Sequence, residues 1–471
     1  MNLRHTYRYR LSMFFSVFVI VFYSLHINAA NKTASTSGNW NSTTTWGGSI
    51  PTASDAVTIN KDITVTVNVA NAVCASLNIN NNKAGTANIT FLAASILTVS
   101  GIVKLSGSSS GQNGTLNMSD GGTLICNSFS LGSGTIVFNA GSGTIQLNAT
   151  NTLPQSAAFS SFNTLIINSG TTTTPNSTIT CNSLQINKNY SGTAKLVFNS
   201  NNATVKVNGT VTIGGNGNNS YVGQIVMSLG GLLDCNNIVL GNSTGPYLTS
   251  GSGTIHLNAD NSLPLTIFNN LTIKKGTTTT TGPLTIWGKL TIGSAPGVGI
   301  LAPQTNIVTV KGDWDYVNTI NGFTETNSTV IFNGSTTQTI RNAGTFYNLS
   351  IDNTNPGTAV FLESNITIKN NLTFINGIID TGNDTAFFES PALATGASNR
   401  SHIKGIAAKL TNGYETFDFP IGDGFHYRPI GIINPSASNV WSAKYTHQAY
   451  INTTSDKPSD TALINHISKV E

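Results

Sequence analysis

The sequence predicts an all-β protein: a right-handed parallel β-helix (solenoid) followed by a small antiparallel β domain that is expected to be incomplete. Two observations predict the solenoid. Apolar residues separated by one polar residue recur through the 471-residue chain, which is the pattern of strands with one buried face. These apolar pairs also return mostly every 19 to 27 residues, and repetition at such an interval is typical of stacked architectures.

The composition fits an ordered β protein and excludes some functions. Only 9% of the residues are charged, against about a quarter in ordinary domains, while β-branched residues are abundant, unlike in disordered chains. The net charge of +4 falls to +1 without Arg4, Arg8 and Arg10 of the leader. With no basic cluster elsewhere, we expect neither nucleic acid nor an anionic membrane as a partner.

Residues 1–30 have the pattern of a signal peptide. A basic segment is followed by an apolar run from Leu11 to Leu25 and then by small residues at Ala29 and Ala30, the order found in secretory leaders. A membrane anchor is the alternative, but the apolar run is short for a span. We predict cleavage near Ala30, a mature protein that is secreted or displayed on the outer cell surface, and no membrane span afterwards.

Residues 31–70 are predicted to form an N-terminal cap. Trp40 and Trp46 flank a polar loop, a turn at 47–51 follows, and residues 55–59 and 63–67 alternate as two strands. A solenoid needs its open end covered, so we expect the two tryptophans to pack as cap and core rather than to bind sugar.

Residues 71–395 are predicted to be the solenoid itself. About a dozen turns stacked roughly 4.8 Å apart would give a rod about 50–60 Å long. Tandem antiparallel sandwiches are the alternative, since the Gly and Asn punctuation partly allows hairpins. The apolar pairs are Leu77/Ile79, Val103/Leu105, Phe129/Leu131, Leu165/Ile167, Leu184/Ile186, Val211/Ile213, Ile238/Leu240, Leu271/Ile273, Leu290/Ile292, Trp314/Tyr316, Leu349/Ile351 and Leu372/Phe374.

A longer repeat overlies this ladder. The segment 143–149 returns as 253–259, and both copies continue to a Leu-Pro and then to a Gly followed by threonines. A looser third copy begins at Ser328. These echoes indicate duplication of a larger unit.

The four cysteines mark one recurring position, before apolar pairs such as Leu184/Ile186. Cys74, Cys126, Cys181 and Cys235 are separated by 52, 55 and 54 residues, which places them at least two turns apart, about 9–10 Å, too far for a disulfide. We predict four buried free thiols, with Ser100 and Asn208 at the matching position of the intervening turns. Trp287 precedes Leu290/Ile292 in the same way and is expected to pack.

Residues 396–471 differ in composition from the preceding repeats, because charged and aromatic residues are more frequent. We expect a separate antiparallel β domain at the end of the rod, and its short length suggests that it is truncated.

No cofactor or metal site is predicted. Asp313 and Asp315 bracket Trp314 on a strand and therefore face the same side; they are weak candidates for calcium ligation or for sugar chemistry, and a solvated strand face is the simpler interpretation.

The chain resembles the β-solenoid repeat region of adhesin-like surface proteins that bacteria export by type IX secretion. The opening from Trp40 to Ile59 is similar to their first strands and to the glycine-named G-eight domain, the segment Ser328–Phe374 to their repeat unit, and Phe419–Gly422 with Arg428-Pro429 and His466–Ser468 to the segment after the repeats. The resemblance implies a surface adhesin or matrix component and transfers no catalytic residue.

The sequence therefore favours an exported, surface-displayed structural or adhesive protein. Its uncharged polar face suits glycans, which are neutral and rich in hydroxyls, or other surface and matrix components. The alternative is a polysaccharide lyase or glycoside hydrolase on the same scaffold, with Asp313 and Asp315 beside Lys or Arg in a groove, since such chemistry needs paired carboxyl groups. The ligand and the oligomeric state do not follow from the sequence.

Overall fold

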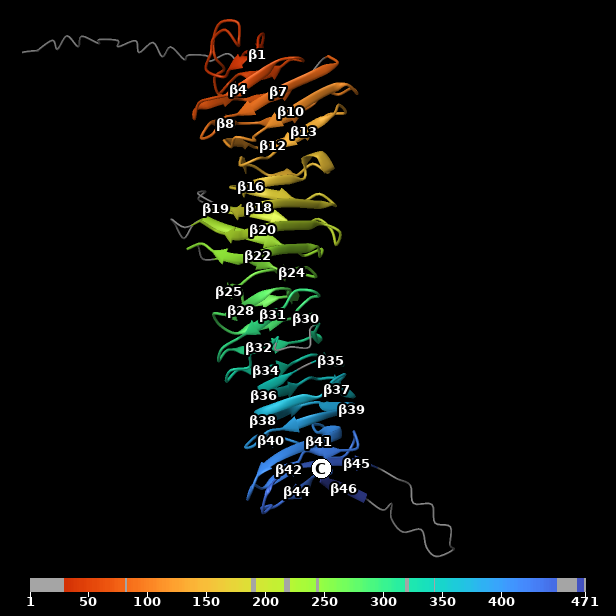
Figure 1. Ribbon diagram of the computed structural model, residues 1–471. Coiled ribbons are helices and arrows are strands. Elements are labelled where there is room, and N and C mark those ends of the chain that lie inside the picture. The colour runs from red at the N-terminus through yellow and green to blue at the C-terminus, as the bar shows by residue number, and fades with distance from the viewer. Residues whose placement is uncertain are drawn as a thin grey trace, which may run out of the picture.

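The computed structural model describes residues 29–80, 83–187, 192–215, 221–242, 245–317, 322–342, 344–446 and 464–469. These residues form a parallel β-solenoid of about 16 turns, which Figure 1 shows as a long rod with its two chain ends at opposite tips. At about 4.8 Å per turn the rod is roughly 75 Å long. It exceeds the predicted 50–60 Å because segments 31–70 and 396–422 also contribute stacked strands.

The expected signal peptide lies, apart from Ala29 and Ala30, outside the described residues. Within the described ranges, no helix has the length and apolarity that a membrane crossing would require.

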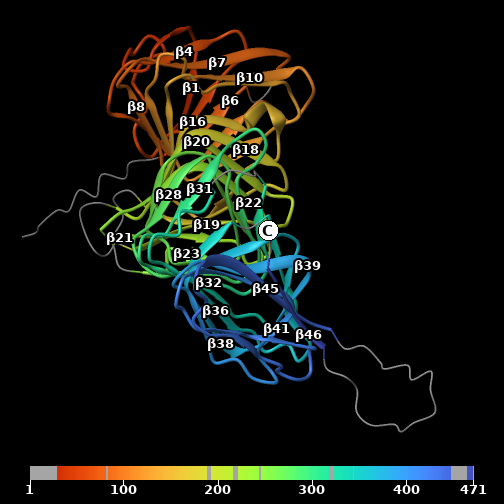
Figure 2. The ribbon, with the colours of Figure 1, turned by 60° about the horizontal axis from the view of Figure 1, so that its bottom comes forward.

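The strands wind around one common axis, as the tilted view in Figure 2 shows, and the apolar side chains that they enclose form one core cluster. The first third of the rod contains β1 (Asn31–Ala34), β2 (Gly38–Asn39), β3 (Ala56–Ile59), β4 (Thr64–Val67), β5 (Ala72–Cys74), β6 (Ser76–Ile79), β7 (Gly85–Phe91), β8 (Ile96–Val99), β9 (Ile102–Leu105), β10 (Gln112–Asn117), β11 (Thr123–Cys126), β12 (Ser128–Leu131), β13 (Ile136–Asn139), β14 (Thr144–Leu147), β15 (Asn151–Thr152) and the short 3₁₀ helix η1 (Ala157–Phe159).

The middle of the rod contains β16 (Ser161–Ile167), β17 (Gly170–Thr173), β18 (Thr178–Ile186), β19 (Gly192–Val197), β20 (Thr204–Ile213), β21 (Tyr221–Val226), β22 (Leu232–Leu240), β23 (Leu248–Thr249), β24 (Thr254–Leu257), β25 (Asn261–Leu263), β26 (Ile267–Phe268), β27 (Asn270–Ile273), β28 (Gly276–Thr280), β29 (Leu284–Ile286), β30 (Leu290–Ile292), β31 (Gly299–Ala302), β32 (Ile307–Val310) and β33 (Trp314–Tyr316).

The last third contains β34 (Thr329–Phe332), β35 (Gln338–Arg341), β36 (Thr345–Asp352), β37 (Thr358–Leu362), β38 (Ile366–Asn376), β39 (Ile378–Phe388), β40 (Leu393–Thr395), β41 (Ile403–Asn412), β42 (Phe417–Phe419), β43 (Ile421–Gly422), β44 (Ile430–Ile432), β45 (Ser438–Thr446) and β46 (Ile464–Lys469).

The predicted apolar pairs form the core, as period-two alternation requires. All of them are buried except Leu131 and Leu240, which are partly buried and still pack against the core. At the N-terminal end, Trp40 and Trp46 are also buried; their rings lie 5.0 Å apart, and the Trp46 indole N–H donates to the Trp40 carbonyl at 2.7 Å. The two tryptophans therefore pack in the core, as predicted.

The long repeat marks the places where one ladder of strands joins another. Most turns carry two consecutive strand segments. Each segment pairs with the corresponding segment of the next turn, so that two separate ladders form, for example through the two halves of β18 and β20. The repeated segments β14, β24 and β34 are single strands of four residues. Each of them pairs with the first strand segment of the preceding turn and with the second strand segment of the following turn. All three copies therefore occupy the same structural role.

Glycines explain why two of these copies look so alike. A side chain at Gly143 would lie 2.6 Å from the Met118 Cβ, and one at Gly253 would lie 2.6 Å from the Met227 Cβ. Each methionine is fully buried, so the tight approach of neighbouring turns excludes any larger residue.

Asparagines hold the corners between turns. Asn163, Asn182 and Asn208 lie in a ladder in which the side-chain amide of each later residue donates to the amide oxygen of the one before, at 3.1 and 3.2 Å. A second type of corner uses buried asparagines with positive φ. Asn80 (φ 61°) and Asn187 (φ 58°) each donate to two main-chain carbonyls at 2.7–3.0 Å. At these corners the asparagine amides thus provide hydrogen bonds to main-chain carbonyls outside the strand ladders.

The antiparallel strands expected after residue 396 are present, and they extend the last turn of the solenoid. β41 pairs in parallel with β39 on one side and antiparallel with β45 on the other, while β42 and β44 form a small antiparallel pair. The ladder of parallel strands thus ends in antiparallel strands.

The four cysteines are free and buried, as predicted. Cys181 and Cys235 are separated in their ladder by Val207, which pairs with both. The predicted occupants of the intervening positions, Ser100 and Asn208, were each wrong by one residue. Val99 pairs with Cys74, and Asn208 lies at the exposed corner, because strand alternation reserves the inward position for an apolar side chain.

We expect the four thiols to resist alkylation in the native protein. Burial raises the pKa of Cys74 and Cys181 to about 12 and that of Cys126 and Cys235 further, so almost no reactive thiolate exists at pH 8. Mass spectrometry after iodoacetamide treatment should show no adduct on the folded protein and four adducts in guanidinium. Rapid labelling of any cysteine without denaturant would contradict this.

Replacing the corner asparagine Asn187 should destabilise the rod. Asn187→Ala removes two hydrogen bonds and places a Cβ-bearing residue without a local polar partner at positive φ, a loss of about 3 kcal/mol, whereas Asn187→Gly loses only the hydrogen bonds, about 2 kcal/mol. Urea unfolding followed by circular dichroism measures both. The exposed Thr193→Ala is the control, expected within about 0.5 kcal/mol of wild type. An alanine variant as stable as that control would refute the role.

Candidate functional site

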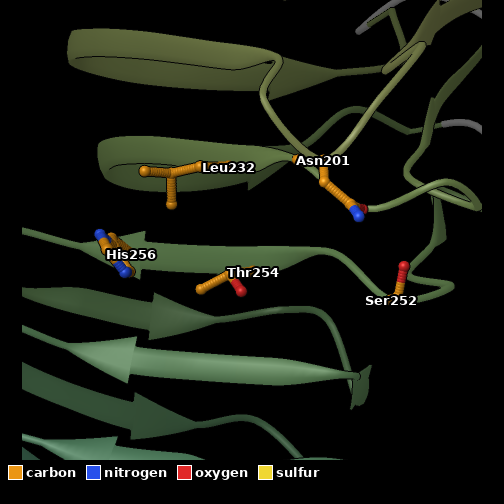
Figure 3. Close-up of a pocket in the computed structure, with 6 residues that line it drawn as sticks. Asn201, Leu232, Ser252, Thr254 and His256 are labelled. Carbon is orange, nitrogen blue, oxygen red and sulfur yellow. The ribbon is translucent and has the colours of Figure 1, made fainter.

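A shallow hollow lies on the rod beside the second copy of the long repeat. Its volume is about 490 Å³, and it is lined by Asn201, Gly231, Leu232, Ser252, Thr254 and His256. Figure 3 shows Leu232 on β22 and both Thr254 and His256 on the neighbouring β24, with Asn201 and Ser252 contributed by turns at one end. Hydroxyl, amide and imidazole groups therefore surround one apolar side chain.

His256 is held in this hollow among charged neighbours. Its strand partner is Asp234, whose carboxylate lies 3.6 Å from the Lys274 ammonium and accepts the Asn258 amide at 2.5 Å. Burial and the charge of Lys274 hold the pKa of His256 below its usual value, although Asp234 opposes them. The buried His256 Nδ1 has no hydrogen-bond partner among the described residues. Sequence reasoning missed this group because His256 stands alone in the chain.

Asp313 and Asp315 flank the fully buried Trp314 and lie on its outer side, as the strand alternation predicts. Each carboxylate has its own cation. Asp315 lies 2.6 Å from the Lys289 ammonium, and Asp313 lies 3.3 Å from the Arg341 guanidinium, which also contacts Glu363 at 2.8 Å. Neither aspartate lines the hollow of Figure 3. The two aspartates thus form an ion-paired strand face.

Trp287 is on the surface, and the expectation that it packs in the core was wrong. Its side chain is 54% exposed, because Ile286 takes the inward position at the end of β29 and Trp287 falls at the corner that follows. The Lys311 ammonium lies 3.6 Å from the centre of its ring, a cation–π contact. The exposed Trp287 thus lies two residues before Lys289, on the turn next to that of Asp315.

The buried charge of Lys409 is held by partners close to it. Lys409 is 1% exposed; its ammonium donates to the carbonyls of Glu389 and Ala392 at 2.9 and 2.8 Å and lies 3.4 Å from the Glu415 carboxylate. Across the described ranges, no three side chains of His, Cys, Asp or Glu are placed to share a metal ion.

Comparisons of the chain with protein-family models, with curated proteins and with solved structures give no match.

The low pKa of His256 predicts a stability loss in mild acid. The unfolded chain takes up a proton near the ordinary histidine pKa of 6.5, whereas the folded chain takes it up only at lower pH. Acidification therefore favours the unfolded state from about pH 6.5 downward. Urea midpoints measured from pH 7.5 to 5 should fall less for His256→Gln than for wild type. Parallel curves would show that His256 is not responsible.

Proposed function

We propose that this chain is an exported, surface-displayed structural or adhesive protein that acts as a rigid β-helical rod. The observation that carries the proposal is the single apolar core, which runs from the N-terminal tryptophans to the C-terminal strands and includes Trp40, Trp314 and Phe419. A rod of stacked turns with a continuous core resists bending and keeps its two ends apart.

The outer face of the rod supports the adhesive part of the proposal. Outward positions on neighbouring strands repeat small hydroxyl and amide residues, such as Thr272 beside Thr291 and the corner ladder from Asn163 to Asn208. Uncharged donors and acceptors in rows suit glycans, which offer hydroxyls in rows. Neighbouring surface or matrix components with the same chemistry are the other partners that fit.

Retention of polysaccharides by the immobilised full chain tests this function. We expect binding to at least one neutral glycan or cell-surface preparation, with affinity that changes less than about threefold between 50 and 500 mM salt, because uncharged contacts are not screened. A bovine serum albumin surface is the control. Absence of binding to the whole panel would leave only a spacer, and loss of binding in high salt would contradict the uncharged contact surface.

A polysaccharide-cleaving enzyme is the second candidate, favoured by the cations beside Asp313 and Asp315 and by the exposed Trp287 one turn away. If the full chain releases reducing sugar or unsaturated products from a polysaccharide panel, Asp313→Asn combined with Asp315→Asn should lower the rate at least about 100-fold. Asp62→Asn, which also removes an ion-paired carboxylate, is the matched control and should retain activity. No product from the wild-type chain would reject the enzyme.

A further inference from the structure

A second hollow, of about 450 Å³, lies where the solenoid meets its antiparallel end. It runs across three successive corners of the rod and the turn that follows β43, and it combines apolar, amide and cationic groups. The lining residues are Thr354, Asn355, Pro356, Asn376, Ile378, Asn399, Arg400, Gly424 and Phe425.

The hydrogen bonds between turns show that these corners are stacked on one another. The Asn353 N–H donates to the Asn376 carbonyl at 2.9 Å, and the Gly377 N–H donates to the Arg400 carbonyl at 3.2 Å. With about 4.8 Å per step, the three corners at 354–356, 376–378 and 399–400 extend over roughly 10 Å. The turn that carries Phe425 is hydrogen-bonded to His402 and Asn399 beside them. The lining of the hollow thus comes from several successive turns, an arrangement that suits a short linear oligomer.

The Phe425 ring projects into water from a turn that is firmly held. Phe425 is 81% exposed, yet the Asp423 carboxylate accepts the N–H groups of Phe425 and His426 at 2.7 and 2.6 Å. The Gly424 N–H donates to the His402 Nε2 at 3.0 Å, and the Tyr427 N–H to the Asn399 side chain at 2.8 Å. Because these hydrogen bonds fix the turn, the exposed Phe425 ring is preorganised for contact with a ligand and needs no rearrangement.

The state of Asp423 agrees with a turn held by its carboxylate. Burial raises the pKa of Asp423, but the hydrogen bonds from Phe425 and His426 outweigh it and leave this pKa below its usual value. Asp423 is thus engaged within the turn, and its charge is directed to the backbone N–H groups rather than into the hollow.

Arg400 supplies an uncompensated charge to the hollow. Among the ion pairs of the described residues, none includes Arg400, although the nearby Asp380 is paired with Lys404 at 2.8 Å. Its neighbour Asn399 accepts the Tyr427 N–H through Oδ1, which leaves its amide NH₂ as a donor. A guanidinium with an amide donor beside it is suited to a carboxylate, which it can bind through two parallel hydrogen bonds.

We propose that this hollow binds an acidic oligosaccharide, with the carboxylate of a uronic acid on Arg400 and the C–H face of a sugar ring against Phe425. Pro356 and Ile378 add apolar surface for the sugar ring, and Asn376 and Asn399 add polar groups for its hydroxyls. The proposal rests on the adhesive function proposed above and adds to the uncharged contact surface one charged site with its own ligand class.

Titration calorimetry of the full chain with short oligomers of galacturonate, mannuronate and glucuronate tests the site and separates the possible sources of the uronate. At least one oligomer should bind, and its methyl ester, which keeps the shape but removes the charge, should bind at least about tenfold more weakly. Arg400→Gln should cause a similar loss. Phe425→Ala should weaken binding about fivefold without changing the thermal midpoint, because the ring is exposed.

Lys206→Gln, which removes an exposed charge from β20, is the matched control and should leave the affinity unchanged. Failure of all three oligomers to bind, equal binding of acid and ester, or full affinity in both the Arg400 and Phe425 variants would each overturn the site. Binding of inorganic phosphate or sulfate in place of the uronates would overturn the ligand class. Retention of neutral glycans by Arg400→Gln would show that the adhesive function stands even if this site fails.

Discussion

The structure depends on one constraint: every corner of the rod must lie directly on an equivalent corner about 4.8 Å away. Charged side chains of one sign repel each other at that spacing, whereas amides can donate to one neighbour and accept from the next. The ladder from Asn163 to Asn208 uses this property. The buried amides of Asn80 and Asn187 instead donate to main-chain carbonyls at the corners. The charged fraction of 9% follows from it, since the long stacked surface leaves little room for Lys and Glu.

Much of the fold could be predicted because the inward residues obey a local rule. Period-two alternation identified core pairs such as Leu184/Ile186, and the spacing of the cysteines was enough to exclude disulfides. The sequence failed where a single residue decides the register. Val207 rather than Asn208 lies between two cysteines, and Trp287 is turned outward because Ile286 takes the core position. A one-residue slip reverses the face of a side chain, and periodicity alone does not locate the corner.

The candidate sites were harder to predict because they bring together residues from different turns. Asp313 and Asp315 were identified as a same-face pair, but their cations Lys289 and Arg341 lie 26 and 28 positions from the aspartates they contact, measured along the chain. The Arg400 hollow joins residues from 354 to 425. Such contacts depend on which residues of neighbouring turns are stacked on one another. Each short strand that joins two ladders changes this register.

The two hollows also indicate where binding can arise on a rod of this kind. Identical turns stacked in register give flat faces with no preference for one position over another, so a hollow requires a break in the repetition. The hollow of His256 adjoins β24, where one ladder joins another, and the hollow of Arg400 adjoins β41, where parallel pairing gives way to antiparallel pairing. The regular turns thus supply length and stiffness, and the interruptions of the repeat supply shape. A rod that recognises a particular ligand is expected to do so at its irregular turns.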